Sequence, residues 1–164
     1  MNFSLPNSPL SIIRSDWQWL LSGAVFSFFL ASILMSGWPV GLLPNLDYPF
    51  TYQNDGAFGG IQRLIEGWIH DNPRSGYPFG SSMADYPTFD AGNFLVIKLL
   101  GTFSDKWHVV HNLYFLLGFP VTFIISFCVL RAFHLGIPFA FAATILFNFL
   151  PFHFVRLPHL FYTW

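Results

Sequence analysis

The sequence predicts an all-α, polytopic transmembrane protein with three spans and one large loop outside the membrane. Of its 164 residues, 54% are hydrophobic and only 9% are charged, whereas about a quarter are charged in soluble globular proteins. Three apolar blocks are long enough to cross a hydrocarbon core of roughly 30 Å at about 1.5 Å rise per helical residue. The segment between the first two blocks is rich in proline, glycine and acidic residues. Its irregular backbone would leave polar groups unpaired in lipid, so it must lie outside the hydrocarbon core.

The net charge, the cysteine count and the lack of a phosphate-binding motif exclude several classes of function. A formal net charge of −1 provides no basic field for nucleic acid. The single cysteine, Cys128, lies in an apolar run, where a thiol is usually an inert hydrophobe, and it cannot form an intrachain disulfide or a cysteine-based metal site. The stretch "GAFGG" lacks the strand, the lysine and the spacing of a phosphate-binding loop, so a membrane ATPase is not expected.

The first apolar block, 17–38, is predicted to be a spanning helix that follows a tail at 1–16. No charged residue occurs between Asp16 and Asp47, and tryptophans at both ends of the block suit the two membrane interfaces. A cleaved signal peptide is the alternative, since Arg14 is a lone positive flank. The apolar run, however, exceeds the usual signal-peptide core of about 7–15 residues.

The loop, 39–106, is predicted to carry two short interfacial helices. Apolar residues recur at helical spacing over 56–70, with Arg63 and Glu66 on the other face, which is typical of an amphipathic helix lying along a bilayer surface. A second apolar stretch, 91–103, is too short to span.

The second spanning helix is predicted at 107–131 and contains Pro120. Proline is tolerated in a membrane helix where neighbours re-pair the freed carbonyl, so we expect a kink rather than a break. A turn at 132–136 is short enough to force an antiparallel hairpin with the third span, 137–155. The remaining segment, 156–164, follows this span at once, and we expect the chain to be truncated, the front part of a longer protein.

Charge alone does not orient the spans. Arg14 and Arg131 would lie on one side of the membrane and the other five of the seven basic residues on the opposite side, so a simple count places the loop inside the cell. A loop approaching about 60 residues can nevertheless translocate regardless of its charge.

Six of the eight acidic residues lie between positions 47 and 90 of the loop. Each has a simple structural interpretation: Asp55 and Asp90 precede the short helices, where a carboxylate caps backbone N–H groups, and Asp47 and Asp85, both in "DYP", can be turn acceptors. Together they also suit chemistry at a membrane surface. Carboxylates can deprotonate a hydroxyl or hold a divalent cation against a phosphate, and the planar guanidinium of Arg74 can donate hydrogen bonds to phosphate oxygens.

The order of these segments resembles the start of the GT-C class of polytopic glycosyltransferases. Locally, "NDGAFGGIQRLIEGW", "DNPRSGYPFG", "ADYPTFD" and "HNLYFLLGFPVTF" are similar to segments of large bacterial membrane proteins of that superfamily. The resemblance extends from about Leu46 to the C terminus. It implies an extracytoplasmic loop, a cytoplasmic N terminus and residence in the bacterial inner (plasma) membrane.

The resemblance also implies a reaction, the transfer of a sugar from a polyprenyl-phosphate-linked donor, in which a loop carboxylate acts as base or helps to hold a cation such as Mg or Mn. By position, Asp55 is the implied catalytic carboxylate and Asp47 its partner. The implied substrate-binding residues are Arg74 at the donor phosphate, Asp85 and Asp90 at the acceptor site, and His153 and His159 at a metal or phosphate. As an alternative, each of these histidines can be an amphipathic anchor at the membrane interface.

Two other functions stay open. A lipid or polysaccharide translocation component would use the loop for binding without bond cleavage. A non-catalytic membrane subunit would need a protein partner. The expected partners of the transferase are membrane lipid and the lipid-linked sugar donor, and nucleic acid is not expected.

Overall fold

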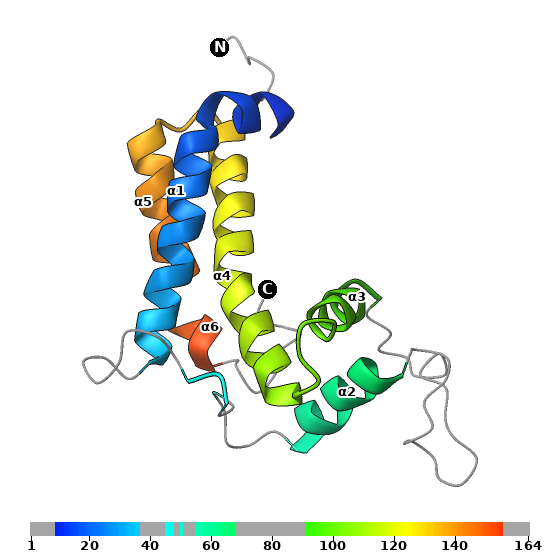
Figure 1. The fold of residues 1–164 in the computed structure, drawn as a ribbon. Helices are drawn as coiled ribbons and strands as arrows, with labels where there is room; N and C mark the ends of the chain where they lie inside the picture. The colour runs from blue at the N-terminus through cyan, green and yellow to red at the C-terminus, as the bar shows by residue number, and fades with distance from the viewer. Residues whose placement is uncertain (1–8, 37–44, 48–49, 51–54, 68–90, 156–164) are drawn as a thin grey trace, which may run out of the picture. The chain divides into compact units, whose positions relative to one another are not determined.

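The computed structural model describes residues 9–36, 45–47, 50, 55–67 and 91–155. Within these ranges all regular secondary structure is helical (Figure 1), which confirms the predicted fold class. The helices are α1 (Pro9–Met35), α2 (Asp55–Glu66), α3 (Ala91–Leu100), α4 (Trp107–Ala132), α5 (Ile137–Asn148) and α6 (Pro151–Val155).

In the described part of the chain, three helical segments are long and apolar enough to cross a membrane, as expected of a membrane protein. They are Ser11–Met35, Trp107–Ala132 and Ile137–Phe154, the last of which combines α5 and α6. These segments overlap the three predicted spans. The fold divides into two compact units: one contains α1, α4 from Leu116 onward, α5 and α6, and the other runs from Asn45 to Phe115.

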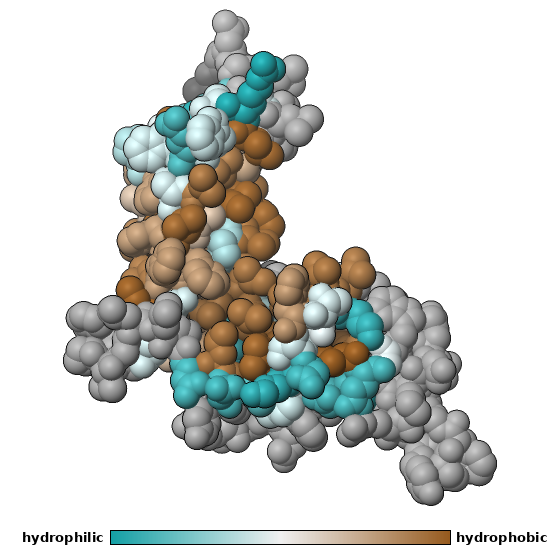
Figure 2. Space-filling view, in the orientation of Figure 1, coloured by the Kyte–Doolittle hydropathy of each residue, from teal (hydrophilic) through white to brown (hydrophobic). Residues whose placement is uncertain are grey.

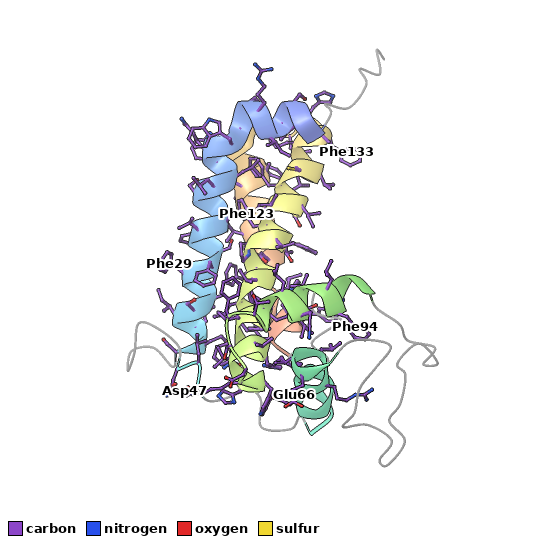
Figure 3. All side chains as sticks on the ribbon, turned by 45° about the vertical axis from the view of Figure 1, so that its right-hand side comes forward. Phe29, Asp47, Glu66, Phe94, Phe123 and Phe133 are labelled. Atoms are coloured by element: carbon purple, nitrogen blue, oxygen red, sulfur yellow. The ribbon has the colours of Figure 1, made fainter. Side chains whose placement is uncertain are left out.

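In the first unit, α1 and α5 run in the same direction and α4 runs in the opposite one (Figure 1). Phe123 of α4 is fully buried and packs directly on Gly23 of α1, where an added Cβ would lie only 1.9 Å from its Cζ. Phe123 lies between the helices and Phe29 points away from them (Figure 3). The absence of a side chain at position 23 therefore sets how closely α1 and α4 approach.

The N-terminal end of α1 differs from the prediction, because the helix begins at Pro9 and not after a tail at 1–16. Asp16 departs from helical geometry at φ −112° and ψ 17° and bends the helix. The stretch before this bend is held by Ile12, which is only 2% exposed. The sequence pattern missed this stretch because its charged residues end the continuous apolar run.

Asp16 also pairs with the far end of α4. Its Oδ2 lies 2.6 Å from Nε of Arg131, and both side chains are largely buried. Ser15 Oγ donates a second hydrogen bond, of 2.9 Å, to Asp16 Oδ1. The start of α1 and the end of α4 therefore lie at the same end of the unit, as the predicted up-and-down order requires.

The turn after α4 is a Schellman motif with a histidine in the left-handed position. His134 has φ 63°, its N–H donates to the carbonyl of Arg131, and the N–H of Leu135 donates to the carbonyl of Leu130. This pattern satisfies carbonyls that the helix end leaves open. It reverses the chain within a few residues into α5, as the predicted turn at 132–136 requires.

Helix α4 continues through Pro120. On the neighbouring helix, Asn148 donates from Nδ2 to the carbonyl of Phe119 at 2.9 Å, so a side chain of α5 reaches the backbone just before the proline. The third span is not one continuous helix, because α5 ends at Asn148 and α6 starts at Pro151. The prediction of one helix at 137–155 missed this interruption, which lies just before a proline.

In the second unit, α2 packs against α3. Ile61 and Leu64 of α2 are buried together with Phe94, Ile97 and Leu100 of α3, and Phe94 lies between the two helices in Figure 3. The apolar face of α2, predicted to lie on the bilayer, is therefore covered by α3.

A lysine of α3 closes the end of α2. Lys98 Nζ donates to the carbonyls of Ile65 at 3.0 Å and Gly67 at 2.6 Å.

Both short helices end earlier than predicted within the described residues. Helix α3 stops at Leu100 because turn-type hydrogen bonds follow, from Thr102 N to Leu99 O and from Phe103 N to Leu100 O.

Candidate functional site

The candidate site is the start of α4 together with the part of the loop that is tied to it. Asn112 makes this connection and is fully buried. Its Oδ1 accepts a hydrogen bond of 3.1 Å from the N–H of Phe50, and its Nδ2 donates one of 3.2 Å to the carbonyl of Leu46. The Phe50 ring also meets the Phe115 ring edge to face at 6.1 Å. One amide side chain therefore fixes both ends of the stretch that carries Asp47.

Asp47 is the only predicted site residue in the loop whose side chain the structure describes. Its Oδ1 lies 3.3 Å from Lys106 Nζ, and the two side chains are 68% and 58% exposed. Its N–H donates to Asn45 Oδ1 at 2.9 Å, which is the local side-chain turn expected of asparagine. The carboxylate is therefore accessible and lies next to the ammonium of Lys106, the residue just before Trp107 at the start of α4.

His111 contacts the side-chain amide of Asn112. Its Nδ1 lies 3.2 Å from Asn112 Oδ1, and because that oxygen is an acceptor, Nδ1 carries the proton. The ring also packs edge to face on Trp107 at 6.4 Å. Nε2 is buried and has no hydrogen-bond partner among the described residues. Complete burial makes this histidine a group that positions Asn112 rather than one that meets a substrate at the surface.

Asp55 is the first residue of α2, and its carboxylate lies outside the described side chains. A carboxylate at this place is favoured by the partial positive charge of the helix N-terminus. The structure thus agrees with the helix start expected near Asp55 and leaves its catalytic role as a prediction.

The remaining predicted site residues belong to the other unit or lie outside the described residues. His153 of α6 belongs to the first unit, where it is 9% exposed and meets the rings of Phe147 and Phe152 edge to face. The alternative role of His153 as an amphipathic anchor at the membrane interface stays a prediction. Four predicted residues lie outside the described part of the chain: Arg74, Asp85, Asp90 and His159.

The described residues contain no group of three or more histidine, cysteine, aspartate or glutamate side chains that could hold a metal ion. Asn112 was not predicted as a site residue. The feature that could have indicated it is a polar amide next to a histidine at the start of an otherwise apolar block.

Comparisons of this chain with known protein families, with curated protein sequences and with solved structures found no match.

Proposed function

We propose that this chain is part of a membrane glycosyltransferase of the GT-C kind, which transfers a sugar from a polyprenyl-phosphate-linked donor to a hydroxyl acceptor. The observation that carries the proposal is the anchoring of the loop by Asn112. It holds an exposed carboxylate, Asp47, beside the end of a spanning helix. A lipid phosphate lies at this level of a bilayer, where the spanning helix leaves the hydrocarbon core.

In the proposed reaction a carboxylate takes the proton of the acceptor hydroxyl. The acceptor oxygen then attacks the anomeric carbon, the bond from that carbon to the phosphate oxygen breaks, and polyprenyl phosphate leaves with the electron pair. We assign the base to Asp55, because Asp47 already faces Lys106 and is better suited to fix the geometry of the loop. Lys106, on the same exposed surface, supplies positive charge that would attract the donor phosphate.

The proposal includes an orientation. The second unit faces the outside of the bacterial inner membrane, and the N terminus lies in the cytoplasm. This orientation rests on the resemblance and on the ability of long loops to translocate regardless of charge.

The test is a transfer assay in lipid nanodiscs with the purified protein, including any longer chain of which it is a part, a radiolabelled polyprenyl-phosphate sugar and a panel of hydroxyl acceptors. We expect Asp55→Asn to lower the transfer rate by about 10²–10⁴-fold, the usual loss for a general base. Glu66→Gln is the matched control, since Glu66 lies on the exposed face of the same helix and contacts Gln62, and it should retain the wild-type rate. An Asp55→Asn rate equal to that of wild type would overturn the assignment of the base, and wild-type protein that transfers no sugar would overturn the proposed function.

A further inference from the structure

The side of α3 that faces away from α2 carries large exposed apolar residues. Leu95, Leu99 and Phe103 are 61%, 60% and 78% exposed. Leu95 and Leu99 lie four residues apart and share one face of the helix, and Phe103 lies in the turn just after its end. We call the three the outer face of α3. In Figure 2 apolar residues cover the α3 side of this unit, whereas a hydrophilic band follows the edge formed by α2 and the start of α4.

The polar side chains of α3 are turned away from this outer face. The helix has only two of them, Asn93 and Lys98. Asn93 accepts a hydrogen bond from the hydroxyl of Tyr114 on α4. Lys98 directs its ammonium to the carbonyls at the end of α2, where the helix dipole favours a positive charge. A helix surrounded by water on this side would carry charged residues on it.

The contact with Tyr114 sets the depth of α3 relative to a span. Tyr114 lies seven residues beyond the start of α4 at Trp107, which corresponds to about 10 Å along the helix axis. Amphipathic helices lie about 5–10 Å into the boundary between headgroups and acyl chains. With ten residues, α3 is about 15 Å long and cannot cross the bilayer. The hydrogen bond therefore holds α3 at the depth of a submerged surface helix.

We propose that the outer face of α3 is inserted into the acyl-chain region of one leaflet of the membrane that α4 crosses. The occupant of this face is lipid, because α3 leads through a short link into α4 at Trp107, so the two helices meet the same bilayer. Helix α2 then lies on the water side of α3, with Gln62 and Glu66 hydrogen-bonded to each other on its surface. The membrane-contacting helix of the loop is thus α3, not α2. This inference does not depend on a transfer reaction.

Depth-dependent fluorescence quenching tests the proposal. In a Cys128→Ala background, single cysteines at Leu95 and Leu99, and at Glu66 as the matched control on α2, are labelled with an environment-sensitive dye. The protein is reconstituted in vesicles of phosphatidylcholine and phosphatidylglycerol that contain a lipid spin-labelled on its acyl chain. We expect quenching at 95 and 99 to be several-fold stronger than at 66, and aqueous iodide to show the reverse order.

Two outcomes would overturn the proposal. Dyes at 95 and 99 that iodide quenches as strongly as the dye at 66 would place the outer face in water. Dyes at 95 and 99 that are shielded from both iodide and spin-labelled lipid would show that protein, either another chain or a second copy, covers this face. Because two neighbouring positions are tested, a local defect at one of them cannot produce either outcome by itself.

Discussion

At the scale of single residues, the contact between Gly23 and Phe123 is the most sensitive one in the first unit. An alanine Cβ at position 23 would stand 1.9 Å from the Phe123 ring, and this fully buried ring can move only by displacing its neighbours. We expect Gly23→Ala to lower the free energy of unfolding by about 1–3 kcal/mol, the usual cost of overpacking. The measurement is the thermal unfolding of detergent-solubilised protein, followed by the loss of helical circular dichroism.

Gly60→Ala is the control for this prediction, because no atom lies within 4 Å of a Cβ added at Gly60 in α2. It should be neutral or should stabilise by up to about 1 kcal/mol, since alanine favours helix over glycine. Replacing the Phe123 ring with a smaller side chain, in the double variant Gly23→Ala with Phe123→Leu, should restore part of the stability lost in Gly23→Ala. Equal stability of the two glycine variants would show that α1 and α4 do not approach as described.

The pair formed by Asp16 and Arg131 is a second test at this scale. The two side chains are only 6% and 19% exposed, so removing one partner leaves a poorly solvated charge. We expect Asp16→Ala to destabilise the protein by about 3–5 kcal/mol. Asp16→Leu combined with Arg131→Met should be milder than the single change, because no buried charge is left.

Lys106→Ala provides the comparison, because its pair with Asp47 is more than half exposed on both sides. Exposed pairs contribute about 0–1 kcal/mol, and this variant should unfold at nearly the wild-type temperature. A loss for Asp16→Ala no larger than the loss for Lys106→Ala would contradict the burial of the pair.

The site residues were predictable only as chemical types. Loop carboxylates were evident because Asp47 and Asp55 stand out after a long uncharged stretch. The role of Asn112 was not, because it depends on contacts with Leu46 and Phe50, more than 60 residues earlier in the chain. Hydropathy along a sequence does not encode such pairings, and an amide in an apolar block gives no indication of its partners.

At the scale of helices, the junction between α2 and α3 depends on Lys98. Its ammonium joins the last turn of α3 to the end of α2, and hydrogen bonds from a charged group contribute about 1.5–3 kcal/mol. We expect Lys98→Met to raise the amide exchange rates of α2 by roughly tenfold or more, since 1.4 kcal/mol corresponds to a factor of about ten. Hydrogen–deuterium exchange with mass spectrometry measures this change.

In the same experiment the amides of α1 should keep their exchange rates, because α1 belongs to the other unit. Lys106→Met is the matched lysine variant and should leave α2 protected. Unchanged protection of α2 in Lys98→Met would mean that the apolar contacts of Ile61 and Leu64 hold the pair without the lysine.

Most helices could be predicted because their determinants are local. The apolar blocks gave the starts of α4 at Trp107 and α5 at Ile137 as the structure has them. The early start of α1 at Pro9 could not be predicted in this way, since the stretch before the bend is stabilised by burial of Ile12 and by pairing of Asp16 with a residue 115 positions later. The assignment of the membrane face failed for α2 for the same reason, because only the structure reveals that α3 covers it.

At the scale of the whole molecule, the proposed function requires that the second unit and the turn after α4 lie on opposite sides of the membrane, with the second unit outside. Among the described residues three helical segments are long and apolar enough to cross the bilayer, and along the chain α4 lies between Glu66 in α2 and His134 in the turn. Both residues are exposed. This topology is the condition on which a lipid-linked substrate can meet the loop carboxylates.

The most direct test is cysteine accessibility in intact cells that express the chain in a Cys128→Ala background. Single cysteines at Glu66 and at His134 are exposed to a membrane-impermeant maleimide, before and after the membrane is permeabilised. With the second unit outside the cell, we expect labelling at 66 in intact cells and at 134 only after permeabilisation. Labelling of 134 but not of 66 in intact cells, or the same behaviour at both positions, would contradict this topology.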